Sequence, residues 1–262
     1  MGKDVLTVKH LSKDYVVKKH MFAPGKTIGA VNDVSFSVRE NESLGLIGES
    51  GCGKTTIANA IMKIIAPSSG RIYACGADIT DLSEEAMRVF RKDIQIVFQH
   101  SGMALDPKMT VSELLKEPLK IHRIVKKKEM DGEVGRLLEM VGIDPDERSK
   151  FPTQLSGGQN QRVIIARAMA TRPRLIVCDE PVSALDVSVQ CQILNLMARL
   201  KREQNLAYLF ISHDINVVRF ICDRIAVMIE GEIVEMGKAD DIVHRPQHEY
   251  TKKLIASAFG LK

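Results

Sequence analysis

The sequence of 262 residues contains no tryptophan, and only 5% of its residues are aromatic. Proteins that bind single-stranded nucleic acid stack the bases on aromatic side chains, so this scarcity argues against a base-stacking surface. The net charge of +4 is too small to argue for a nucleic-acid partner. No nucleic-acid partner is therefore expected.

Long apolar runs are also missing, because no stretch approaches the roughly 18 uncharged apolar residues that a membrane-spanning helix needs. The N-terminal residues Met1–Val5 lack the apolar core of a signal peptide. The five cysteines are scattered and form no C-x-x-C pair, which predicts reduced thiols and no metal site. With 45% apolar and 27% charged residues, the composition is that of a soluble globular protein, and the scattered cysteines predict a cytosolic one.

Residues 48–55, Gly-Glu-Ser-Gly-Cys-Gly-Lys-Thr, fit the pattern G-x-x-x-x-G-K-[ST] of a phosphate-binding loop. The apolar run Ser43–Ile47 predicts a buried strand before this loop, and the apolar spacing of residues 55–65 predicts a helix after it. Glycines let successive backbone N–H groups converge on an anion, and the helix dipole adds positive charge. The pattern could also be a simple glycine turn, but its strand and helix flanks favour a nucleotide site. The predicted nucleotide-binding residues are Gly48, Ser50, Gly51, Cys52, Gly53, Lys54, Thr55 and Thr56.

Two carboxylates end a second apolar strand, Leu175–Cys178. Carboxyl ends of strands are where open α/β sheets bind ligands, so Asp179 is expected to hold Mg²⁺ together with the Thr55 hydroxyl. Glu180 would polarise the water that attacks the γ-phosphate, and Lys54 would reach the β- and γ-phosphates. An acidic turn after a strand is common, but an upstream phosphate loop favours the catalytic interpretation.

The stretch Leu155–Gln159, Leu-Ser-Gly-Gly-Gln, precedes a predicted helix. A serine and two glycines at a helix N-terminus form a lip that can bind an anion. By itself this stretch would more simply be a turn with an N-cap. Its position between the phosphate loop and the Asp179–Glu180 pair favours a function.

This stretch, the Gln161-Arg162 pair after it and the upstream phosphate loop together resemble the ATP-binding cassette (ABC) ATPases. The resemblance implies that a lip in each subunit closes on the γ-phosphate of ATP held by the partner subunit's loop. In this chain the lip comprises Ser156, Gly157, Gly158 and Gln159.

Four further residues match positions of this family. The resemblance implies that Gln99 senses Mg²⁺ and the attacking water, and links to the membrane partner. It implies that Asp186 crosses a dimer interface and that His213 contacts the γ-phosphate, while Tyr15 stacks on adenine. The predicted catalytic residues are Lys54, Gln99, Glu180 and His213, and the predicted Mg²⁺ ligands are Thr55, Gln99 and Asp179.

Four stretches resemble the oligopeptide, dipeptide and nickel importers of the family: residues 16–24, 97–111, 180–190 and 245–251. The chain departs from their pattern at His100, Gly102 and Glu249. Some relatives bind an iron–sulfur cluster through a longer cysteine-containing tail. No cysteine follows Cys222, so no cluster is expected.

The resemblance implies the ATPase subunit of an importer for peptides, nickel or a metal chelate, at the cytoplasmic face of the cell membrane. The implied partners are a second, paralogous ATPase, two transmembrane permease subunits and, indirectly, an extracytoplasmic solute-binding protein. A homodimer is the alternative pairing. An exporter ATPase, an ABC ATPase that acts without a membrane and a cassette without turnover are the alternative functions.

The expected fold is an α/β P-loop core of ABC type with an N-terminal antiparallel β subdomain and an inserted α-helical subdomain. We expect one domain over 1–262, in which residues 1–45 form the β subdomain and 100–159 the helical insertion. Residues 46–99 and 160–235 form the RecA-like core, and 236–262 an extension. Within the β subdomain, separate strands at residues 5–8 and 15–17 and a loop over 18–29 are expected, and a long helix is expected over 187–204.

Overall fold

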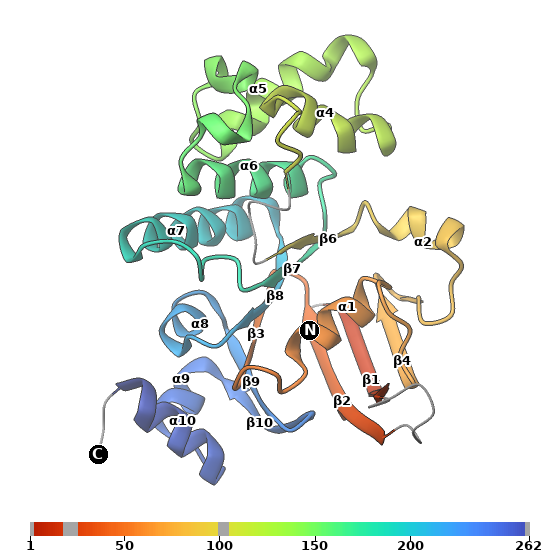
Figure 1. Ribbon diagram of the computed structural model, residues 1–262, viewed down its shortest axis with the longest axis vertical. Helices are drawn as coiled ribbons and strands as arrows, with labels where there is room; N and C mark the ends of the chain where they lie inside the picture. The colour runs from red at the N-terminus through yellow and green to blue at the C-terminus, as the bar shows by residue number, and fades with distance from the viewer. Residues whose placement is uncertain (1–2, 18–25, 99–104, 260–262) are drawn as a thin grey trace. The chain divides into compact units, whose positions relative to one another are not determined.

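The computed structural model describes residues 3–17, 26–98 and 105–259. It divides into two compact units (Figure 1). The first unit combines Met1–Met87 with Ala207–Lys262, and the second comprises Arg88–Leu206. Each unit holds part of the predicted nucleotide machinery, so each is described by itself.

An antiparallel sheet in the first unit has the strand order β2-β1-β4-β5. Val34, Phe36 and Val38 are buried in alternation with more exposed residues, which is the pattern of a strand with one face on the core. The antiparallel β layer expected near the N-terminus is therefore present. Its strands are β1 (Asp4–Val17), β2 (Lys26–Arg39), β4 (Ser69–Ala74) and β5 (Ala77–Asp78).

Two local expectations for this sheet are wrong. The segments predicted as separate strands at 5–8 and 15–17 belong to the single strand β1, whose pairing with β2 shifts register between Val8 and Leu11. Residues 26–29, expected in a loop, begin β2, and Tyr15 pairs with Ile28. Cross-strand pairing between β1 and β2 explains both outcomes.

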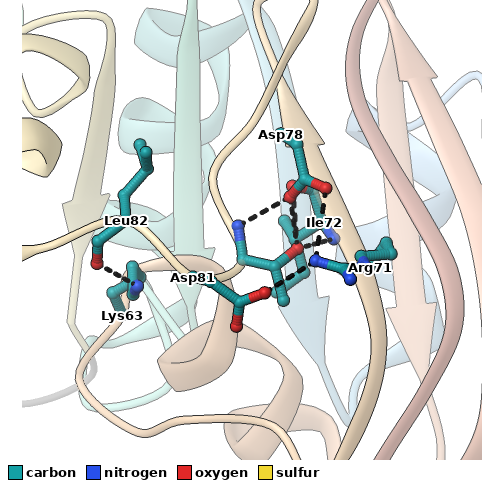
Figure 2. Close-up of polar contacts among 7 residues, drawn as sticks. Lys63, Arg71, Ile72, Asp78, Asp81 and Leu82 are labelled. Carbon is teal, nitrogen blue, oxygen red and sulfur yellow. Dashed lines mark hydrogen bonds and ion pairs between the residues drawn. The ribbon is translucent and has the colours of Figure 1, made fainter.

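Polar contacts hold the β4–β5 hairpin and the end of α1 (Figure 2). Arg71 Nη1 lies 2.6 Å from a carboxylate oxygen of Asp81 and 3.6 Å from one of Asp78. Lys63, just past α1, donates to the carbonyl oxygen of Leu82. The arginine pairs are solvent-exposed, so each contributes at most about 1 kcal/mol and they mainly fix the local geometry.

A second set of strands in the first unit has the order β10-β9-β3-β8, with β3 parallel to both β8 and β9. Both β3 and β8 are buried at every residue, as expected for parallel strands covered on both faces. Helix α8 contacts β3 and β8, while α9 contacts β9 and β10. The elements are β3 (Ser43–Ile47), β8 (Ala207–Ser212), β9 (Arg224–Ile229), β10 (Glu232–Lys238), α1 (Lys54–Ile61), α8 (Ile215–Ile221), α9 (Ala239–His244) and α10 (Glu249–Phe259).

The second unit combines a parallel strand pair, β6 and β7, with a helical layer. Helices α4, α5 and α6 contact one another, and α6 also contacts α7 and β6 (Figure 1). Helices α4 and α5 lie within residues 100–159, where the sequence predicts helices. The elements are α2 (Glu84–Phe90), which leads into this unit, β6 (Ile94–Val97), α4 (Val111–Ile121), α5 (Met130–Met140), α6 (Gly157–Met169), β7 (Leu175–Asp179) and α7 (Val187–Gln204), with 3-10 turns at Lys127–Glu129, Pro145–Ser149 and Pro152–Gln154.

Within the described ranges, every helix is either too short or too polar to span a lipid bilayer. The same ranges contain no group of three or more histidine, cysteine, aspartate or glutamate side chains arranged to hold a metal ion.

Candidate nucleotide-binding site

The predicted phosphate loop connects β3 to α1 in the first unit. Ile47, the last residue of β3, pairs with Ser212, the last residue of β8. Gly48 and His213 therefore follow neighbouring parallel strands at the same edge of the sheet. Carboxyl ends of parallel strands are the usual ligand-binding edge of such sheets.

The side chain of Lys54 is turned into the loop and is only 7% exposed. Its ammonium nitrogen donates to the carbonyl oxygens of Gly48, at 2.7 Å, and Glu49, at 2.8 Å. The Cys52 sulfur lies 3.6 Å from the same nitrogen. A buried ammonium needs such partners, and these contacts draw the loop around one positive charge.

The start of α1 depends on Gly53, which has a φ of 107° in the left-handed region. A Cβ atom at this position would lie 2.2 Å from the carbonyl oxygen of Ala30 on β2. Gly53 has no side chain, so α1 begins without a side-chain cap. Amides at the start of a helix bind anions such as phosphate.

Two other predicted site residues, His213 and Tyr15, also belong to the first unit. His213 is exposed and immediately precedes Asp214, whose carboxylate caps α8 by accepting from the amide of Asn216 at 2.8 Å. Tyr15 is 40% exposed, and the Lys13 ammonium lies 5.3 Å from the centroid of its ring. The hairpin of β1 and β2 that carries Tyr15 also brings Ala30 against Gly53, as described above.

In the second unit, Asp179 is the last residue of β7 and is only 6% exposed. Glu180 follows with a φ of 52°, an uncommon left-handed conformation for a residue other than glycine. Its carbonyl oxygen accepts from the hydroxyl of Ser183 at 3.1 Å and from the amide of Ser183 at 3.4 Å. This tight turn fixes the direction of the Glu180 backbone directly after the strand.

Ser156 begins α6 with a complete capping box. Its hydroxyl accepts from the Gln159 amide at 3.2 Å, and the Gln159 side-chain oxygen accepts from the Ser156 amide at 2.9 Å. The Gln159 side-chain nitrogen also donates to a carboxylate oxygen of Glu147 at 3.0 Å. The predicted lip is therefore a well-formed and exposed helix start.

The predicted lip and the predicted interface residue Asp186 lie close together in the second unit. A Cβ atom on Gly158 would lie 2.6 Å from a methyl carbon of Val189, in the first turn of α7. Asp186 caps that helix, since its carboxylate accepts from the Val189 amide at 3.0 Å and from the Ser188 hydroxyl at 2.7 Å. These hydrogen bonds, the Val189 amide foremost, lower the pKa of Asp186.

Gln99 lies outside the described residues, as do the departures His100 and Gly102. Sequence reasoning missed a different residue, Tyr250, whose hydroxyl oxygen accepts a hydrogen bond from the Glu49 amide of the phosphate loop at 3.2 Å. In the sequence, the stretch 245–251 is distinguished only by its family resemblance. Nothing local in it indicates a contact with a loop 201 positions away.

Comparison with known proteins gives consistent results. The ABC transporter family matches residues 31–183. The oligopeptide transport ATP-binding protein OppF of Bacillus subtilis (strain 168) is 42% identical over 259 residues, covering 98% of this chain and 83% of OppF. The glutathione import ATP-binding protein GsiA of Pectobacterium atrosepticum is 45% identical over 88% of this chain, which spans 37% of that longer protein.

A solved structure of the ATP-binding cassette MJ0796, a dimeric post-hydrolysis state bound to ADP and Pi, is similar in fold. The TM-score is 0.78 at 32% sequence identity, covering 89% of this chain and 98% of the other.

Proposed function

The chain belongs to the ABC transporter family of ATPases, and from this premise we propose that it is the subunit that powers an importer for peptides. The observation that carries the proposal is the 42% identity to an oligopeptide transport ATP-binding protein over 98% of the chain. The second relative is named for glutathione, itself a short peptide, and both names describe uptake. Import of nickel or a metal chelate is the alternative, ahead of an exporter or an ATPase without a membrane partner.

In this proposal the phosphate loop binds the triphosphate of ATP. The Lys54 ammonium exchanges the carbonyl oxygens of Gly48 and Glu49 for β- and γ-phosphate oxygens, which carry more negative charge. His213 contacts the γ-phosphate from the adjacent strand end, and Tyr15 stacks on adenine. The shared sheet edge of the loop and His213 supports the first contact, and the exposed ring of Tyr15 supports the second.

The Thr55 hydroxyl, the Asp179 carboxylate and Gln99 are the proposed ligands of Mg²⁺. Thr55 is exposed at the start of α1 and Asp179 ends a strand, and both offer the oxygen ligands that this ion prefers. Bound Mg²⁺ neutralises charge on the phosphates. Glu180 takes a proton from the attacking water as the water oxygen bonds to the γ-phosphorus and the bond to ADP breaks.

The proposed partners are a second ATPase, two transmembrane permease subunits and, indirectly, a solute-binding protein outside the cell. The second ATPase is a paralogous chain or a second copy, and the location is the cytoplasmic face of the cell membrane. Ser156–Gln159 and Asp186 act across the contact between the two ATPases. Exposure of the α6 N-terminus and the transport names of the relatives support this arrangement.

The test is uptake by cells in which the native copy carries Glu180→Gln. We expect accumulation of a labelled tripeptide to be lost while accumulation of radioactive nickel is unchanged. The exposed Glu203→Gln, at the end of α7, is the matched control and should transport normally. Loss of nickel uptake alone would assign the metal importer instead, and normal uptake of both would contradict the importer proposal.

A further inference from the structure

The C-terminal segment of the chain contacts the phosphate loop. Tyr250, in the first turn of α10, places its hydroxyl oxygen 3.2 Å from the Glu49 amide nitrogen, which donates to it. Both residues belong to the first unit. The contact therefore joins the phosphate loop to a helix that lies about two hundred positions further along the chain.

Glu49 is held from its other side as well. Its carbonyl oxygen accepts from the Lys54 ammonium at 2.8 Å and from the Cys52 amide at 3.3 Å. With Tyr250 on the amide, both polar backbone groups of Glu49 have partners. The first part of the loop is thereby fixed by two contacts from within the loop and by one from outside it.

The segment before Tyr250 is itself anchored. The Glu235 carboxylate on β10 accepts from the amides of Gln247, at 2.8 Å, and His248, at 3.0 Å. A ring nitrogen of His248 then accepts from the Tyr250 amide at 3.2 Å. Burial raises the pKa of Tyr250.

The same C-terminal segment also contacts the helix that follows His213. Helix α10 contacts α8, and Arg219 of α8 lies 3.0 Å from a ring nitrogen of His244 at the end of α9. Figure 1 shows α10 in dark blue beside α9, which contacts β9 and β10. One segment thus reaches both the phosphate loop and the helix that follows His213.

We propose that Tyr250 is a positioning residue for the phosphate loop, and that through it the C-terminal segment sets the affinity of the loop for ATP. Tyr250 acts by fixing the Glu49 amide and does not touch the nucleotide. The inference rests on the proposed function for its effect on ATP. The contact itself is independent of that function.

The test is Tyr250→Phe, which removes the hydroxyl and keeps the ring. We expect the KM for ATP to rise about two- to tenfold, the effect of one hydrogen bond, while kcat stays within about a factor of two. Exchange of the Glu49 amide with deuterium in the nucleotide-free protein should become faster. The matched control is Tyr73→Phe, which removes a hydroxyl from β4 in the same unit and should change neither quantity.

Glu235→Gln supplies a second variant, because the amides of Gln247 and His248 bond to different oxygens of the Glu235 carboxylate and glutamine offers only one acceptor oxygen. This variant should also raise the KM for ATP and speed exchange of the Glu49 amide, by a smaller factor than Tyr250→Phe does. Unchanged exchange and unchanged KM in Tyr250→Phe would overturn the inference, as would an equal effect of Tyr73→Phe. If the native protein hydrolyses no ATP, the proposed function fails, and the exchange of Glu49 alone then decides whether Tyr250 positions the loop.

Discussion

Two glycine-rich stretches open helices in this protein, and they are built in opposite ways. The phosphate loop leads into α1 through Gly53, which is left-handed and makes no side-chain cap. The lip at Ser156 leads into α6 through a capping box in which serine and Gln159 satisfy each other's amides. The start of α6 is thus capped by a side chain, whereas α1 begins at a glycine that has none.

The difference indicates how the two stretches should depend on nucleotide. In the loop, a buried lysine already gathers oxygen atoms, and phosphate oxygens can replace them. In the lip, the Ser156 hydroxyl that is proposed to meet a phosphate also caps its helix. Changes in the loop should therefore abolish ATP binding by the isolated chain, whereas changes in the lip should abolish turnover and leave binding intact.

The largest effect is expected from Lys54→Ala. Loss of the ammonium removes at least two charge-assisted hydrogen bonds to phosphate, so ATP affinity should fall by at least about 100-fold. Titration of the purified chain with a fluorescent ATP analogue measures this. Lys63→Ala is the matched control, because Lys63 also donates to a backbone carbonyl of the first unit but lies beyond the end of α1. Equal binding by Lys54→Ala and the native protein would contradict the site.

Replacing Ser156 by aspartate separates its two roles. Aspartate caps helices as well as serine does, so the melting temperature should stay within a few degrees. Its negative charge would oppose phosphate, and ATP hydrolysis should fall about 100-fold, the cost of losing a transition-state donor. Ser156→Ala, which loses the cap, should instead lower the free energy of unfolding by about 1 kcal/mol. Normal hydrolysis by Ser156→Asp would contradict the proposed contact with phosphate.

The glycines of the two stretches should also differ in their tolerance of alanine. Gly53→Ala would place a Cβ atom 2.2 Å from a backbone oxygen at a left-handed φ, so we expect a loss of stability of about 1–3 kcal/mol or more. Gly158→Ala would place its Cβ 2.6 Å from a methyl carbon of Val189, so a side chain and not the backbone must shift, and alanine favours the helix by about 1 kcal/mol, so we expect a smaller loss. Urea unfolding of both variants measures the difference. Equal losses of stability would show that the phosphate loop does not require glycine more strictly than the lip does.

Local signals explain what the sequence predicts well. The helix predicted over residues 187–204 has those bounds in the structure. Asp186 caps its start, and Asn205 adopts a left-handed conformation at its end, so both signals lie next to the helix that they bound. The phosphate loop is likewise predictable, because its backbone geometry demands glycine at fixed spacing.

Long-range contacts explain what the sequence does not predict. The helix expected over 55–65 ends at Ile61. Lys63, just beyond it, adopts a left-handed φ of 54°, a conformation that a glycine would have signalled in the sequence. The strand at Lys26 depends on pairing with β1, and the role inferred for Tyr250 depends on a loop 201 positions away. Periodicity and caps report on neighbours in the sequence, so these features become visible only in the fold.

The smallest effect is expected from acid, which should act differently on the starts of α6 and α7. The Ser156 hydroxyl caps α6, whereas the Asp186 carboxylate caps α7. Hydrogen bonds from the Val189 amide, and then from the Ser188 hydroxyl, hold the pKa of Asp186 below its ordinary value of 3.8. A carboxyl whose pKa is lower in the folded state contributes stability that is present above its ordinary pKa and lost as the pH falls through the folded value. Protection of the first turn of α7 against amide exchange should therefore decrease slightly below pH 3.8, while the first turn of α6, capped by Ser156, stays protected.

The measurement is amide exchange corrected for the intrinsic effect of pH, over the acidic range in which circular dichroism shows folded protein. Asp186→Ser is the matched control, because serine also caps α7 but does not titrate in this range. Its first turn should keep the same protection throughout. If acid lowers the protection of this turn equally in the native protein and in Asp186→Ser, the ionised carboxylate does not explain the acid sensitivity of α7.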